Sequence, residues 1–392
     1  MKIHKTHIES ILQFLLRNKA LLYGVILMTI LLKILLFPVR LGDYNFYLEP
    51  WINFIKTHNY FYALKYDFYN YTPPYMYILV FLAKLGFNPL YSIKIVSVFF
   101  EYLLAFYIGK IIFLKFADKR YILLSVAILP LVPTVLLNGA FWGQCDSIYS
   151  AFVVVSLYHV INKRMLLSLF FLGVAFAFKA QTAFIFPLFF LVFIKKDIRW
   201  YQFLVIPFVY FIAIIPTWIQ GRDLIDLFTI YSKQSDYFRT LTLFLPNVYV
   251  WVSDDFYVVG KTVGIITTIA VVIIGGYWLK SKQFTFDVDI FVTIAFLSVI
   301  ITPFLLPGMH ERYLYLGDIF SVLYIILRRK KIYIPIGVIS VSFYAYMCCS
   351  RLKEILPLWP AFFVYLMVII LLLIDLKEMI KEKKEIYHGN IK

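Results

Sequence analysis

The sequence predicts an all-α integral membrane protein, a polytopic bundle of transmembrane helices forming a single domain over residues 1–392. Hydrophobic residues make up 62% of the chain and charged residues only 15%, and the mean hydropathy is +0.83. A soluble domain has roughly 45–50% apolar and about 25% charged residues. Apolar runs long enough to cross a bilayer recur from Leu21 to Ile374. They leave no segment large enough to form a separate soluble domain.

The formal net charge of +16 would by itself suggest a nucleic-acid partner. The basic residues, however, gather in short loops between the apolar runs, and that placement is a signal of membrane topology. We therefore expect membrane lipids, and no nucleic acid, as partners. The three cysteines, Cys145, Cys348 and Cys349, do not have the number or spacing of a disulfide framework.

Residues 1–19 are predicted to form an amphipathic helix on the cytoplasmic membrane surface. Their apolar side chains share one helical face, and their basic side chains lie elsewhere. The apolar run that follows lacks an obvious small-residue cleavage site, so it is predicted to be the first span and not a signal peptide.

About twelve spans are predicted along the chain. They cover residues 20–39, 91–114, 121–138, 147–161, 165–179, 181–194, 202–219, 259–279, 288–306, 313–327, 332–349 and 356–376. The apolar stretch from Pro73 to Phe87 is only about 14 residues long, which suits an interfacial or re-entrant helix better than a span.

The positive-inside rule selects the topology. If 73–87 stays outside, the basic loops, both termini and the tail 377–392 lie in the cytoplasm, while ten acidic residues between Asp43 and Glu311 lie on the other side. Counting 73–87 as a span would invert every later loop. Two long outer loops, 40–90 and 220–258, are then expected to carry membrane-surface helices.

A first polar cluster opens the outer loop 40–90. Asp43 follows the first span, and a carboxylate held at the membrane surface could act as a general base. A solvated acid at a helix end is the alternative. Pro73 and Pro74 are expected to start a surface helix, since proline is tolerated in a first turn.

Another polar cluster, from Asn138 to Ser147, lies between two apolar spans and includes Trp142, Gln144 and Asp146. Unpaired polar groups in such a place are costly, so their density indicates a site. An ordinary loop in which Asp146 caps the next helix is the alternative.

A further cluster follows a Pro-Gly break at a span boundary and comprises His310, Glu311, Arg312 and Tyr313. An arginine fork suits phosphate oxygens. Alternatively, Arg312 could extend to the lipid headgroups.

Other polar side chains interrupt apolar runs. Lys179, followed by Gln181, is a candidate because an intramembrane lysine is functional by default. Lys33 and Glu101 are expected to pair or to face the bundle interior.

These motifs, in this order, resemble those of the GT-C glycosyltransferases, which are multispan enzymes that take sugars from polyprenyl-phosphate carriers. The resemblance covers most of the chain and is closest to bacterial relatives of the second mannosyltransferase of GPI-anchor assembly. It rests on an acid after the first span (Asp43), a Pro-Pro aromatic helix (Pro73, Pro74), a WGQCDS loop (Trp142 to Ser147), Lys-x-Gln (Lys179, Gln181) and HERY (His310 to Tyr313).

The resemblance implies an inverting transfer of a hexose, with mannose favoured, from a polyprenyl-phosphate donor to a glycan, lipid-linked or protein acceptor. The site would face outward from a bacterial cytoplasmic membrane. Many members carry two adjacent acids in the first loop, whereas Tyr44 follows Asp43 here, so Asp43 and Asp146 are both candidates for the base. No cofactor is expected, and no metal, because the outer acids are scattered. The matching segments are expected to bind substrate through Trp142, Gln144, Lys179, Gln181, His310, Glu311, Arg312 and Tyr313.

Two other functions stay open. A secondary transporter or flippase of lipid-linked sugars would show repeats with interrupted helices and charges near the middle of the membrane. The polar clusters instead gather at one face, and no internal repeat is visible. A polysaccharide polymerase or ligase would also keep a long outer loop.

Overall fold

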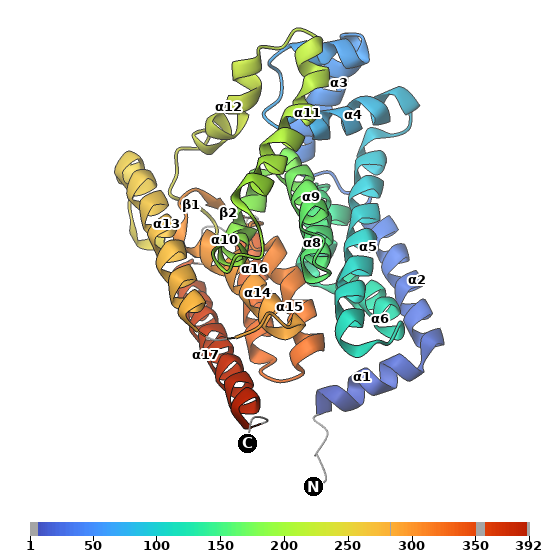
Figure 1. The fold of residues 1–392 in the computed structure, drawn as a ribbon. Coiled ribbons are helices and arrows are strands. Elements are labelled where there is room, and N and C mark those ends of the chain that lie inside the picture. Colours follow the sequence, from blue (N-terminus) through green and yellow to red (C-terminus); the bar gives the residue numbers. More distant parts are fainter. Residues whose placement is uncertain (1–6, 283, 350–356, 390–392) are drawn as a thin grey trace.

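The chain, seen as a computed structural model, is a helical bundle over the described residues 7–282, 284–349 and 357–389 (Figure 1). The only regular strands in those ranges are β1 (Thr242–Leu243) and β2 (Met309–His310), which pair in parallel. The predicted all-α class is therefore confirmed. Residues 1–6 of the predicted surface helix, residue 356 of the last predicted span and residues 390–392 of the predicted tail lie outside the described residues.

Six helical segments of the described chain are long and apolar enough to cross a membrane, which fits a multi-pass integral membrane protein. A seventh crossing results if Arg120–Leu131 and Pro133–Trp142, which meet at 71°, form one bent span. The six are α2 (Lys19–Leu36), α5 (Pro89–Phe116), Trp200–Ile219 with α11 (Val205–Ile219), Asp254–Ser281 with α13 (Tyr257–Ser281), α14 (Val288–Leu305) and α17 (Trp359–Gly389).

The predicted number of about twelve spans is not confirmed, because several predicted spans are shorter helices. A helix of 14 residues, such as α9, is about 21 Å long, against a hydrocarbon core of about 30 Å. In α8, 13 of the 16 residues are buried, so its apolar character reflects packing against protein. These shorter helices are α8 (Asp146–Ile161), α9 (Met165–Phe178), α10 (Phe186–Ile194), α15 (Tyr315–Arg328) and α16 (Tyr333–Cys349).

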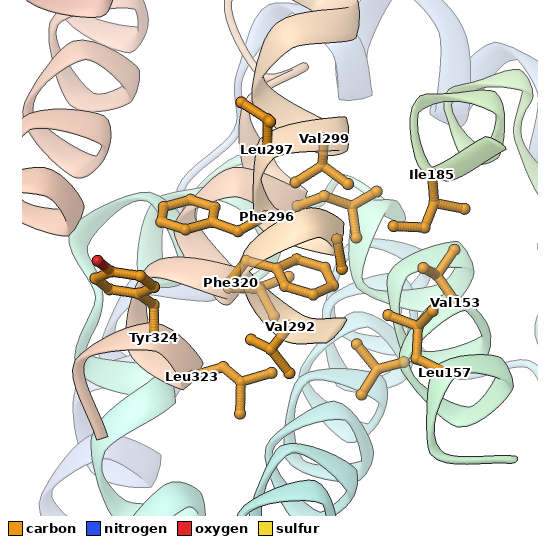
Figure 2. Packing of buried hydrophobic residues seen from close by; sticks show 14 of the residues in the cluster. Val153, Leu157, Ile185, Val292, Phe296, Leu297, Val299, Phe320, Leu323 and Tyr324 are labelled. Carbon is orange, nitrogen blue, oxygen red and sulfur yellow. The ribbon is translucent and has the colours of Figure 1, made fainter. Parts of the chain in front are cut away.

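The main hydrophobic core joins the early and late helices of the bundle. Figure 2 shows Ile185 beside Val153 and Leu157 of α8, and Phe296 of α14 beside Tyr324 of α15 on the other side of the same core. All five side chains are buried. The core therefore fixes α8 relative to α15. Asp146 begins α8, and the predicted site residues His310 to Tyr313 directly precede α15.

The first long loop folds into a layer of short helices at one end of the bundle. They are η1 (Tyr44–Leu48), α3 (Glu49–Thr57), η2 (Tyr60–Lys65) and α4 (Pro73–Leu85). The proline pair begins α4, as predicted, and Gly86 ends it with a φ of 72°. A separate apolar cluster that includes Trp51 and Met76 holds this layer together.

The second long loop, with α12 (Leu224–Ser235), lies against the first. Arg222 joins the two, because its guanidinium bonds Asp67 Oδ1 at 2.6 Å and Asp226 Oδ2 at 2.5 Å. We call this end of the bundle, formed by residues 40–90 and 220–258, the loop end. The first described helix, α1 (His7–Arg17), and the end of α17 lie at the opposite end (Figure 1).

Candidate active site

A cavity of about 240 Å³ lies at the loop end, between the two long loops and the starts of α8 and α15. Nine of the ten predicted site residues line it, although they come from four separate segments of the chain. The tenth, Asp146, lies directly behind Lys179. The nine are Asp43, Trp142, Gln144, Lys179, Gln181, His310, Glu311, Arg312 and Tyr313.

Breaks in the helices deliver these side chains to the cavity. Lys179 has an extended backbone, with φ −152° and ψ 139°, between α9 and the 3-10 turn η5 (Ala180–Ile185). His310 follows Gly308, whose φ of +73° favours glycine, and lies in β2. An uninterrupted helix would bury its polar groups against lipid or protein, so the breaks are what give these residues access to a common space.

Asp43 is the accessible carboxylate of the site. Its side chain is 30% exposed, and its Oδ2 accepts a hydrogen bond from Gln144 Nε2. Arg312 Nη1 lies 3.6 Å from the same oxygen. One amide and one guanidinium therefore orient this carboxylate while leaving it open to the cavity.

Asp146 is a buried carboxylate with a full set of partners. Its side chain is only 2% exposed, and it accepts hydrogen bonds from Lys179 Nζ at 2.6 Å and Asn138 Nδ2 at 2.8 Å. Arg312 Nε lies 3.7 Å away. Asp146 is thus bound to side chains from other segments, and the alternative of a simple helix cap does not describe it.

Arg312 lies among the three acids of the site. It is 15% exposed, and its Nη1 donates to Glu311 Oε1 at 2.8 Å. It therefore faces the cavity and does not extend to lipid headgroups. Burial raises the pKa of Glu311, but Arg312 and His310 outweigh that effect and lower the pKa to about 2. Glu311 is consequently ionised at neutral pH and holds Arg312 in place.

Several buried polar atoms around the cavity have no hydrogen-bond partner within the described protein. Two are donors, Trp142 Nε1 and Arg312 Nε, and two are acceptors, Asn70 Oδ1 and Gln181 Oε1. Buried polar groups are nearly always paired, so each exception calls for an explanation. A polar ligand that carries both hydroxyl groups and acceptor oxygens would form hydrogen bonds with these donors and with these acceptors.

Aromatic side chains form much of the remaining lining, and sequence reasoning named none of these as site residues. Tyr71 and Tyr75 belong to the Pro-Pro segment, which was predicted only as a structural helix. Tyr47 and Tyr237 come from the two loops and meet across the cavity, where their hydrogen bond, together with partial burial, raises the pKa of Tyr47 to about 12. Phe238 and Tyr237 carry no sequence signal, because the second loop has no periodic pattern.

A second cavity of about 290 Å³ adjoins the first and has a different character. It shares His310 and Tyr313 with the first cavity, and it adds Arg239, Lys261 and several apolar side chains. One wall is formed by α13. Only 11% of the most apolar stretch of this helix is buried, so most of the helix lies outside the protein core. The second cavity therefore combines positive charge with an apolar wall. Its helix α13 lies at the edge of the bundle (Figure 1).

The acids of the site are held by cations and amides of the protein itself. Among the described residues, no group of three or more His, Cys, Asp and Glu side chains is arranged to hold a metal ion. In comparisons with known proteins, no protein-family model, curated protein or solved structure matches this chain.

Proposed function

We propose that this protein is a membrane glycosyltransferase that moves a hexose from a polyprenyl-phosphate carrier to an acceptor hydroxyl, with inversion at the anomeric carbon. The observation that carries the proposal is the convergence of four predicted chain segments on one cavity, which places the accessible carboxylate of Asp43 beside buried cations. Resemblance to the GT-C family favours mannose as the sugar. The distribution of basic loops supports an outward-facing loop end.

Asp43 is the base in this proposal. A general base must reach the proton that it removes, and Asp43 is 30% exposed to the cavity, whereas Asp146 is 2% exposed. The acceptor hydroxyl gives its proton to Asp43, and its oxygen forms a bond to the anomeric carbon. The bond from that carbon to the phosphate oxygen breaks, and polyprenyl phosphate leaves with the electron pair.

Asp146 is assigned a supporting role. It neutralises Lys179 at 2.6 Å and approaches Arg312 at 3.7 Å, so it keeps two cations at the edge of the cavity. Fixed positive charge stabilises a leaving phosphate without reorganisation during the reaction.

We assign binding of the lipid carrier to the second cavity. A polyprenyl phosphate has an anionic head and a long apolar chain, and the lining of this cavity offers Arg239 and Lys261 beside the largely bare face of α13. His310 lines both cavities, so the phosphate would lie near it and the sugar would project toward Asp43. From the resemblance, the phosphate was expected to leave near Lys179, His310 and Arg312, and in this assignment Lys179 and Arg312 face it from the first cavity.

The test is a transfer assay with purified protein in lipid vesicles. Radiolabelled polyprenyl-phosphate mannose is supplied with membrane-derived acceptors, and wild type is compared with Asp43→Asn and with Asp255→Asn, an exposed acid in the second loop. Wild type and Asp255→Asn should transfer label, while Asp43→Asn should be slower by about 10²–10⁴-fold.

Two results would count against the proposal. Transfer by Asp43→Asn at the wild-type rate and expression level would reject the base. Movement of label across the bilayer without a new glycosidic bond would instead support the transporter or flippase.

A further inference from the structure

One face of α5 carries three buried polar residues, Lys94, Ser97 and Glu101, at spacings of three and four residues. Such spacings place side chains on the same face of a helix. Glu101 pairs with Lys33 of α2 at 2.5 Å, as expected from the sequence, and Ser97 Oγ donates to the carbonyl of Gln144 at 2.6 Å. This face of α5 therefore contacts both α2 and the segment that supplies Gln144.

Lys94 has an unusual set of partners for a buried lysine. It is fully buried, and all four hydrogen bonds that its Nζ donates among the described residues go to backbone carbonyls. An ammonium has three protons, so the four acceptors share them. The acceptors are Leu36 O and Phe37 O at 3.2 Å, Val39 O at 2.7 Å and Phe141 O at 3.0 Å.

Three of these carbonyls belong to the end of α2 and the turn after it. The last carbonyls of a helix have no partner within the helix and carry partial negative charge, so a cation there stabilises the helix end. Val39 lies four residues before Asp43. Lys94 thus fixes the backbone that leads directly into the proposed base.

The fourth carbonyl belongs to the segment that orients the same base. Phe141 lies three residues before Gln144, whose Nε2 donates to Asp43 Oδ2. Between them Gly143 turns with a φ of +76°, and a Cβ at that position would lie 3.6 Å from Lys94 Cε. The turn therefore wraps around the lysine side chain.

We propose that Lys94 is a positioning residue for the transfer reaction. It ties the end of α2 to the turn 141–144 so that Gln144 meets Asp43 in one orientation. This inference rests on the proposed function, because it assigns Asp43 as the base. The rule that directed attention to Lys179, that a lysine within an apolar run is functional by default, applies equally to Lys94.

The test compares Lys94→Met with Lys110→Met, a control on the same helix whose lysine lies 4.4 Å from the Tyr158 ring centroid, away from the cavity. Two quantities are measured in detergent-solubilised protein. One is amide hydrogen exchange over residues 36–45 and 139–146, and the other is the pair kcat and KM for the donor. Lys94→Met should exchange faster in both segments and should lose about 10²-fold in kcat at unchanged KM, because small misplacement of a reacting group has that cost.

Gly143→Ala disturbs the same turn from the other side and serves as the second variant if Lys94→Met does not fold. It should lower kcat and leave KM unchanged, since alanine is strained at that φ. Lys110→Met should match wild type in both measurements.

The inference fails if kcat of both site variants equals that of Lys110→Met, or if KM rises while kcat is kept. It also fails if activity falls without faster exchange in either segment. Full activity of Asp43→Asn would reject the proposed base and this inference with it, and the exchange result would then still report whether Lys94 anchors the two segments.

Discussion

Two buried aspartates at opposite ends of the bundle hold similar networks of charge. Asp146, at the loop end, binds Lys179 at 2.6 Å and lies 3.7 Å from Arg312. Asp375 of α17 binds Arg328 at 2.9 Å and Lys331 at 3.0 Å. Their side chains are 2% and 0% exposed, so burial and ion pairing alone do not distinguish the two networks.

Access distinguishes them. The network of Asp146 lies against a cavity and includes Asp43, a carboxylate with spare accepting capacity and 30% exposure. In the other network, Tyr324 OH donates a hydrogen bond to Asp375 Oδ2 at 2.7 Å. None of the residues in this network lines either cavity at the loop end. We conclude that chemistry is expected where an ion network meets a cavity, and that a similar network without one serves the fold.

The sharpest test of this comparison removes each aspartate in turn. Asp146→Asn removes the carboxylate partner of Lys179, and Asp375→Asn removes that of Arg328, so each should lower the free energy of unfolding by about 3–5 kcal/mol. Only Asp146→Asn should also reduce transfer activity per folded molecule. Thermal unfolding in detergent and the vesicle transfer assay measure the two effects.

A double variant separates stability from activity at the loop end. Asp146→Asn combined with Lys179→Met removes the unpaired charge, so most of the stability should return while activity stays low. Recovery of full activity in the double variant would show that this network is as purely structural as that of Asp375.

The sequence predicted which polar residues meet in one cavity better than it predicted the number of spans. Polar residues such as Asp43 and Arg312 are visible at the ends of apolar runs, and a membrane bundle brings such ends together. The length of a span is harder to infer, because α8 and α9 are apolar through contact with protein and are too short to cross alone. Tyr237 and Lys94 were missed because their roles depend on contacts across the fold, with Tyr47 and with carbonyls of two other segments.

Acid stability should also distinguish the two ends. Arg312 and His310 lower the pKa of Glu311 to about 2, against an ordinary value of 4.5, so its contribution is complete above pH 4.5 and is lost as the pH falls toward 2. The shift corresponds to on the order of 3 kcal/mol. Glu311→Gln should flatten the fall in unfolding free energy between pH 5 and about 2, measured by tryptophan fluorescence in acid-stable detergent.

The exposed Glu378, which pairs with Lys331 at 2.5 Å in the other network, is the matched control. Glu378→Gln should follow the wild-type acid profile closely. Identical profiles for wild type and Glu311→Gln would mean that Arg312 does not hold Glu311 as the structure indicates.

The smallest expected effect concerns the cations that adjoin the site without belonging to the buried network. Lys261 pairs with Asp236 at 2.7 Å, yet it is 25% exposed and lines the second cavity, so it can turn to a phosphate. A hydrogen bond to a charged group contributes about 1.5–3 kcal/mol. Lys261→Met should therefore raise KM for the lipid-linked donor about tenfold and leave kcat and KM for the acceptor unchanged. Lys280→Met, in the last turn of the same helix, should change neither constant. A fall in kcat at unchanged KM would show that Lys261 acts on the transition state. Equal kinetics for both variants would mean that the carrier phosphate binds near Arg312 and not in the second cavity.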